Sequence, residues 1–359
     1  MSLRVDVHQH LWSPPLVEAL RRRRTPPRLD GWRLHLTGEP PFDVDPADHD
    51  VDSRAALVRE DGLDRALVSL SSPLGIEMLP PAEARPLLDA YHEGAAALPG
   101  AFGAWAAATV SEIDPAALAH TLDASGSRFA GVQLPAAALA DPAALERSSP
   151  LLDVVEARDL PLLIHPGPAR TPTPAPLNAP PSPPGPPRQD TSGQGTPGQE
   201  APAHGAPGQG APSQGAFSQG VSGGVADGMP GWWAAVVPYV QEMHAAWFAF
   251  RAFGRARHPR LRVCFTMLAG LAPLHGERVA ARGGGRGTVD PLVFVETSSY
   301  GPRAADAVVR ALGVDAIVHG SDRPYARPRD LHLGEAAEHA FRVRNPHLLL
   351  FGKEPTRVA

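Results

Sequence analysis

Eight short apolar segments, most of them separated by stretches of helical length, restrict the fold of this chain more than any other feature. Each segment has the length of a strand and is either alternating or continuously apolar, as half-buried and fully buried strands are. Strands that alternate with helices favour a parallel sheet, and eight such units favour a (β/α)₈ TIM barrel over an open doubly wound sheet. The segments are Leu3–His10, Arg65–Ser71, Phe102–Val110, Phe129–Leu134, Leu160–His165, Leu261–Leu268, Leu292–Thr297 and Ala316–Gly320. The helical stretches include Pro81–Leu98, Pro115–Ser125, Pro142–Arg158, Trp232–Arg257 and Pro302–Leu312.

One segment, residues 168–229, does not fit this alternation, because Pro, Gly, Ser, Gln and Ala dominate it in short degenerate repeats. It has too few apolar side chains to offset the entropy lost on ordering. We therefore predict one domain over residues 1–359, with a disordered low-complexity insertion after the fifth strand. A partner-binding role for the proline-rich stretch 180–187 is the alternative interpretation.

Charge and cysteine usage exclude several classes of protein. The chain has 33 basic and 38 acidic residues, and no clustered basic face predicts nucleic-acid binding. No apolar stretch reaches the ~18 residues of a membrane span, and no signal peptide is evident at the start. The single cysteine, Cys264, excludes a disulfide framework and a thiolate metal cluster. We expect a cytoplasmic protein with a small-molecule substrate, and a homodimer is possible.

The first strand carries a polar motif, Asp6-Val7-His8-Gln9-His10. Side chains on a strand repeat every two residues, which predicts that Asp6, His8 and His10 share one face. Two neutral imidazoles at this spacing suit a divalent metal ion, and a carboxylate behind them can orient one ring through its second nitrogen. A surface strand that is polar on one side is the alternative.

Two further strands end in residues of the same kind. The fifth ends in His165, and the eighth is followed by Asp322. The chemistry of such barrels lies at the carboxyl ends of the strands. His8, His10, His165 and Asp322 can therefore surround one divalent ion and leave a position open for water. Taken singly, His165 can cap a strand, and Asp322 can cap a helix or pair with Arg323.

The motifs resemble those of the amidohydrolase superfamily, in particular the amidohydrolase-related group with aminocarboxymuconate-semialdehyde decarboxylase and sugar-lactone hydrolases. The resemblance implies that these four residues are the metal ligands and that Asp322 also handles the proton of a metal-activated water. The resemblance covers the whole chain except the insertion. The motifs that carry it are Asp6-Val-His8-Gln-His10, Leu162-Leu-Ile-His165-Pro-Gly, Arg257-His-Pro-Arg-Leu-Arg-Val263 and Gly320-Ser-Asp322-Arg-Pro.

The chain departs from these relatives after the sixth strand, where Met267 stands in the place of a histidine that assists the reaction in the family. A thioether cannot accept a proton at neutral pH. His275 lies a few residues further on and is our candidate substitute. His319 is a weaker candidate, because strand alternation points it to the opposite face. His244, in a helical pattern, is expected to pack against the barrel.

Lysine usage sets the expected number of metal ions. Binuclear relatives bridge two metals with a carboxylated lysine at the end of the fourth strand, whereas this chain has Gln133 there and one lysine, Lys353, in its C-terminal tail. We therefore expect one ion. Zinc is the first expectation for nitrogen and oxygen ligands at an open site, and manganese is possible.

The function predicted from these motifs is hydrolysis of an amide, ester or lactone through a mononuclear metal-activated water. Asp322 and His275 are the catalytic candidates. Non-oxidative decarboxylation of the aminocarboxymuconate-semialdehyde type is the first alternative, and a catalytically altered or inactive metal-binding barrel is the second. The candidates for contact with the substrate are Trp12, Gln133, Tyr300 and Arg323.

Overall fold

A barrel of eight parallel strands forms the centre of the computed structural model, which describes residues 3–37, 39–124, 126–168, 230, 232–284 and 289–353. Backbone hydrogen bonds of 2.9 Å from Val7 N to His319 O and from Asp322 N to His8 O join the last strand to the first. The predicted TIM barrel is confirmed, and all eight predicted strands are present. In their order around the barrel they are β1 (Val5–Gln9), β5 (Arg65–Val68), β6 (Phe102–Ala107), β7 (Phe129–Pro135), β8 (Leu162–His165), β9 (Val263–Phe265), β10 (Val293–Glu296) and β11 (Ile317–Val318). The predicted insertion lies outside the described residues from residue 169 to 229.

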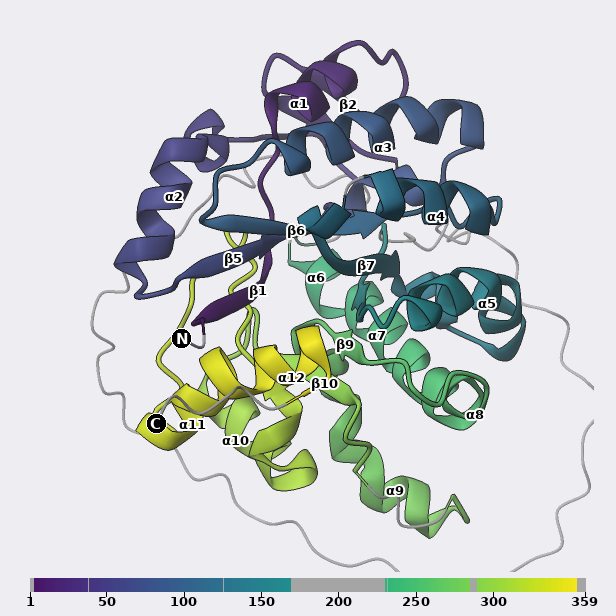
Figure 1. Ribbon diagram of the computed structural model, residues 1–359, viewed down its shortest axis with the longest axis vertical. Helices are drawn as coiled ribbons and strands as arrows, with labels where there is room; N and C mark the ends of the chain where they lie inside the picture. The colour runs from purple at the N-terminus through teal and green to yellow at the C-terminus, as the bar shows by residue number, and fades with distance from the viewer. Residues whose placement is uncertain are drawn as a thin grey trace, which may run out of the picture.

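Helices surround the strands (Figure 1), and proline sets where many of them begin. Proline lacks an amide hydrogen and has a fixed φ, so it suits the first turn of a helix. It opens α1 (Pro14–Arg21), α3 (Pro81–Ala96), α4 (Pro115–Ala124), α5 (Pro142–Ala157), α7 (Pro238–Ala249) and α10 (Pro302–Leu312). The remaining helices are α2 (Val51–Glu60), α6 (Trp233–Val236), α8 (Arg255–Arg257), α9 (Gly276–Ala281), α11 (Glu335–His339) and α12 (Asn345–Phe351).

The predicted helix over residues 232–257 is divided into several pieces. Pro238 separates α6 from α7, and a π-helical turn at Phe250–Gly254 separates α7 from α8. No helix among the described residues has the length and apolarity needed to cross a membrane.

The strands separate two layers of apolar side chains. The larger layer packs the strands against the helices. The smaller cluster draws buried side chains from seven of the eight strands and from α12, and Ala130 of β7 packs against it. Its buried members are Val5, Val7, Leu67, Trp105, Leu163, Cys264, Phe294, Val318 and Leu349. It accounts for Cys264, which is fully buried. Because this smaller cluster is apolar, the polar side chains gather elsewhere, at the carboxyl ends of the strands.

A small antiparallel sheet lies between β1 and β5 in the sequence and was not predicted. Its strands are β2 (Arg28–Asp30), β3 (Arg33–His35) and β4 (Phe42–Asp43). Strands of two or three residues are too short for an alternating pattern to be recognised. The sheet is relevant to function, because Leu34 and Phe42 form part of the cavity described below.

Candidate metal centre and its cavity

Four side chains from distant parts of the sequence meet at the carboxyl ends of the strands. His8 and His10 come from β1 and its end, His165 ends β8, and Asp322 follows β11. The Nε2 atoms of His8 and His10 are 3.1 Å apart, and His10 Nε2 is also 3.1 Å from Asp322 Oδ1. One ligand atom from each of the four residues lies within 4.8 Å of all the others. The sequence-predicted ligand set is therefore brought together.

The second nitrogen of each ring faces an acceptor, which orients the ring. His10 Nδ1 lies 3.1 Å from Ser69 O, and His165 Nδ1 lies 2.8 Å from Pro166 O. His8 Nδ1 lies 3.2 Å from the carboxylate of Glu296. If each Nδ1 donates its proton to that acceptor, the lone pair of each Nε2 is directed into the cluster. This is the arrangement that protein histidines adopt when they bind metal ions.

Burial and the neighbouring groups together set the pKa values in this cluster. Burial lowers the pKa of His10, and burial with the neighbouring His8 and His10 rings holds the pKa of His165 well below its usual value. For His8, burial opposes protonation, but the Glu296 carboxylate outweighs it and the pKa is raised. The Asp322 pKa is lowered, because hydrogen bonding to His10 and the nearby imidazoles overcome its burial. Three imidazoles and one carboxylate are a set of ligands that fits one divalent metal ion.

The cluster opens into a cavity of about 420 Å³. Its walls are mainly apolar and aromatic, and they come from the small sheet, from β-strand ends and from α6 and α7. Trp12 and Tyr300 line it, as predicted for residues in contact with a substrate. The other lining residues away from the cluster are Leu34, Leu36, Glu39, Phe42, Ser71, Pro73, Leu74, Pro166, Ala235, Val236, Tyr239, Val240, Met267, Ser299 and Tyr325.

Asp6 does not share the face of the histidines, contrary to the alternation prediction. An irregularity in the pairing of β1 with β5, between Asp6 and Gln9, adds one residue to β1. Such a bulge re-aims the side chains that follow it. The Asp6 carboxylate accepts the backbone amides of His8 and Ser321 at 3.0 and 3.1 Å, and it also accepts from the Gln9 side chain. Asp6 therefore supports the backbone beneath the cluster, while Glu296 contacts the ring.

Two of the predicted substrate contacts lie outside the cavity lining. Gln133 is fully buried, and its Nε2 donates to Leu70 O at 2.7 Å and to Ser72 Oγ at 2.8 Å. The Arg323 guanidinium forms a two-point ion pair with Asp61 at 2.8 and 3.0 Å. Both side chains contact neighbouring parts of the protein, and the structure does not bring either of them into the cavity lining where we predicted a substrate contact. Position at a strand end does not specify the direction of a side chain.

Met267 lines the cavity at the end of β9, and no imidazole replaces it there among the described lining residues beyond the cluster. His275 is exposed, and its ring packs against His244 at 4.7 Å between centroids. His275 is not among the residues that line the cavity, so the structure does not bring it to the cluster as the substitute acid or base that we predicted.

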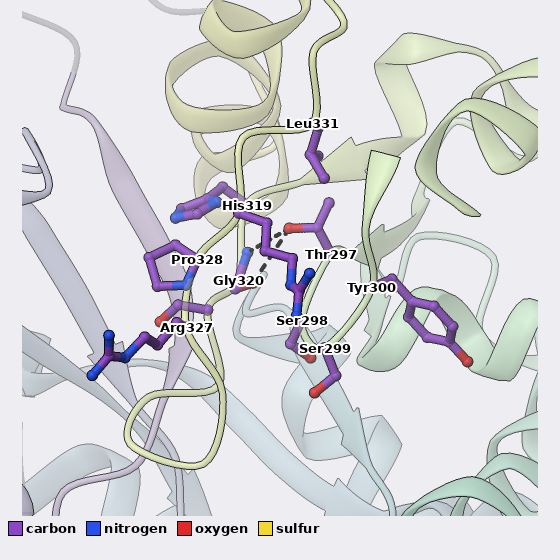
Figure 2. Close-up of a pocket in the computed structure, with 11 residues that line it drawn as sticks. Thr297, Ser298, Ser299, Tyr300, His319, Gly320, Arg327, Pro328 and Leu331 are labelled. Atoms are coloured by element: carbon purple, nitrogen blue, oxygen red, sulfur yellow. Dashed lines mark hydrogen bonds between the residues drawn. The ribbon is translucent and has the colours of Figure 1, made fainter. Parts of the chain in front are cut away.

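His319 lies behind the cluster and lines a small separate pocket (Figure 2). Its Nε2 is 3.9 Å from Asp6 Oδ2, which agrees with the prediction that it faces away from the metal ligands. In this pocket Thr297 and Gly320 are hydrogen-bonded to each other at 3.3 Å. The volume of about 10 Å³ leaves room for no more than a water molecule.

Sequence analysis missed Glu296, which has no exposed surface and ends β10. A charged residue at the carboxyl end of an otherwise apolar strand was the available signal, and it is the same signal that identified His165. Without the position of His8, the sequence does not show whether this carboxylate contacts a metal ligand or only a neighbouring helix or loop.

Comparisons with known proteins identify relatives by fold alone. No protein family profile and no curated protein sequence matches the chain. Among solved structures, IDCase from Metarhizium anisopliae has a TM-score of 0.65 at 16% identity over 97% of both chains. The 5-carboxyvanillate decarboxylase LigW from Sphingomonas paucimobilis has a TM-score of 0.61 at 17% identity, over 98% of this chain and 99% of that one.

A third similar structure contains a metal ion. It is the 5-carboxyvanillate decarboxylase from Novosphingobium aromaticivorans, complexed with manganese and 4-hydroxy-3-methoxy-5-nitrobenzoic acid. Its TM-score is 0.60 at 15% identity, over 97% of this chain and 96% of that one. The chain therefore has the fold of these decarboxylases.

Proposed function

We propose that this protein is a metal-dependent, non-oxidative decarboxylase of a small carboxylic acid and a member of the amidohydrolase superfamily. The observation that carries the proposal is the three-histidine, one-aspartate cluster at the base of a cavity with aromatic and aliphatic walls. The fold shared with several decarboxylases supports this function over the hydrolysis predicted from the motifs.

His8, His10, His165 and Asp322 would hold the ion. A divalent ion bound there would supply positive charge that stabilises the negative charge developing on the substrate. Manganese is a stronger candidate than it was from the sequence, because a structural neighbour was solved with it, and zinc remains the other candidate.

The protein's own groups would then act in two ways. Apolar walls such as Leu34, Phe42 and Val240 exclude water from the carboxylate that is to be lost. When the bond between that carboxylate and its carbon breaks, carbon dioxide leaves and the carbon keeps the electron pair, so it must take up one proton. Asp322 borders the cavity, with Ser299 Oγ 3.4 Å from its Oδ2. Asp322, whose side chain is 18% exposed, is placed to take this proton from solvent and deliver it to the carbon.

Hydrolysis of an amide, ester or lactone is the second candidate, because it would use the same four residues. One observation favours it: the Asp322 side chain retains 18% exposure, enough for a general base to meet a water molecule. Met267 limits both reactions equally, since a thioether cannot transfer a proton and, with the three histidines holding the ion, the proton transfers fall to Asp322.

The experiment combines metal analysis with two substrate panels. We expect about one Mn²⁺ or Zn²⁺ per chain, and carbon dioxide release from hydroxy- or amino-substituted benzoates by the metal-loaded protein. The His8→Ala, His10→Ala double variant removes two of the four ligands, so it should lose the metal and lose more activity than the roughly 10- to 100-fold that follows from the loss of one residue that orients a ligand. His120→Ala, an exposed histidine on α4, is the matched control and should behave as wild type.

Three outcomes separate the candidates. Turnover of the ester, lactone or amide panel with no carbon dioxide release would replace decarboxylation by hydrolysis. Equal metal content in the wild type and the double variant would refute the site. A stoichiometric metal without turnover of either panel would support the inactive barrel.

A further inference from the structure

Glu296 is a buried carboxylate with donors on both of its oxygens. Oε1 lies 3.2 Å from His8 Nδ1 and accepts the Met267 amide at 2.7 Å. Oε2 accepts the Ser298 amide at 2.6 Å, and the Ser298 hydroxyl donates to Oε1. A fully buried carboxylate costs much free energy unless such contacts satisfy it. These contacts link the end of β10 to two other strands, β1 through His8 and β9 through Met267.

The Met267 amide begins an uncommon stretch of backbone. Met267, Leu268, Ala269, Gly270 and Leu271 have φ values of 55°, 47°, 53°, 59° and 63°, a run in the left-handed region. This conformation costs each residue other than glycine roughly 1–2 kcal/mol. Surrounding contacts must hold such a turn, and strained backbone of this kind clusters at functional sites. The hydrogen bond from Met267 to Glu296 is a contact of that kind, at the residue where the turn starts.

The neighbouring strand leaves space for this carboxylate. A Cβ atom added at Gly320 would lie 2.1 Å from Glu296 Oε2 and 3.1 Å from His8 Cβ. The distance to Oε2 is too short for real atoms, so any side chain at position 320 would displace the carboxylate from His8. The absence of a side chain at Gly320 is therefore required for the contact between Glu296 and His8.

We propose that Glu296 is a positioning residue that couples the His8 ring to the Met267–Leu271 turn, so that metal affinity and the order of this turn depend on each other. The carboxylate fixes the ring with Nε2 toward the cluster and increases its basicity as a ligand. The same carboxylate holds the first amide of the turn. The inference rests on the proposed metal site and adds to it a residue that does not touch the ion.

The test uses the full-length Glu296→Gln variant, which keeps the size of the side chain but not its capacity to accept four donors. Affinity for Mn²⁺ is measured by competition with a chelator, and amide hydrogen exchange is measured over residues 267–271. We expect affinity to fall about 10- to 100-fold, the usual loss for a residue that orients a ligand. Exchange in the turn should rise in the metal-free and the metal-loaded variant.

Glu77→Gln is the matched control. Glu77 is as fully buried as Glu296, but its contacts are with Ser72 and Gln133. It should keep the wild-type Mn²⁺ affinity and the wild-type exchange over residues 267–271. This control distinguishes the effect of removing any buried carboxylate from the effect of removing the carboxylate beside His8.

Gly320→Ala keeps the proposal testable if Glu296→Gln does not fold. The added methyl group should displace the carboxylate and lower Mn²⁺ affinity in the same direction. Wild-type affinity in every folded variant would overturn the inference while leaving the metal site in place. Failure of the wild-type protein to bind Mn²⁺ or Zn²⁺ would instead refute the proposed function.

Discussion

Two buried carboxylates, on different sides of the barrel, are equally hidden from solvent but differ in their surroundings. Glu296 at the end of β10 has both oxygens occupied by donors. Glu77, in the short 3₁₀ helix Ile76–Met78, has its contacts on Oε1, and Oε2 lacks a hydrogen-bond partner among the described residues. Burial raises the pKa of Glu77, despite its hydrogen bonds to Ser72 and Gln133.

The difference follows from what each carboxylate supports. Glu296 lies beside an imidazole of the metal cluster and a strained turn. Its carboxylate contacts the His8 ring and accepts the first amide of the turn. Glu77 and Gln133 hold the chain after β5, where Ser72 begins a turn that carries Pro73 and Leu74 into the cavity wall. Burial alone therefore does not identify a functional acid. The identity of the donors around it is more informative, and the following variants test this distinction.

The largest effect is expected at the cluster itself, from Asp322→Asn. An amide cannot deliver a proton, so kcat/KM for the decarboxylated substrate should fall about 10²- to 10⁴-fold. The three histidines remain, so the variant should still bind Mn²⁺, although more weakly. Steady-state kinetics and metal analysis of the same preparation measure both. Asp306→Asn, on the exposed side of α10, is the control. Activity within threefold of wild type would remove Asp322 from the mechanism.

The sequence was sufficient for the barrel and for the identity of the cluster, because both depend on periodic or positional signals. Apolar strands separated by helices predict the barrel, and polar residues at strand ends predict His165 and Asp322. Side-chain direction was less predictable. The extra residue in β1 directs the Asp6 side chain away from the ring of His8. Arg323 forms an ion pair with Asp61, which is far away in the sequence. These outcomes depend on long-range packing, which a local pattern does not contain.

The Glu77 carboxylate, which lies behind the cavity wall, should affect the pH dependence of stability. The folded-state pKa of Glu77 is raised above the usual value of 4.5, so folding favours its protonated form. Its contribution is fully present below pH 4.5 and is lost as the pH rises through the raised pKa. The free energy of unfolding of wild type, minus that of Glu77→Gln, should therefore decrease with pH, by at most ~1.4 kcal/mol per unit.

Urea unfolding of both proteins at several pH values between 4.5 and 8 measures this difference, with the metal-free protein used throughout so that ion binding does not contribute. A difference that stays constant across the range would show that Glu77 is ionised as readily in the folded as in the unfolded chain.

The smallest effect is expected from His275→Ala, because His275 contacts neither Glu296 nor Glu77. The side chain is exposed and packs on His244, so its removal should change the free energy of unfolding by less than about 0.5 kcal/mol. Its ring does not line the cavity, so kcat/KM should stay within about twofold of wild type, since no interaction with the reacting groups is lost. A loss of tenfold or more with unchanged stability would mean that the turn after β9 brings His275 over the cluster when substrate binds. Asp322 would then not be the one acid or base of the site, and the strain in Met267–Leu271 would belong to a moving segment instead of a fixed support.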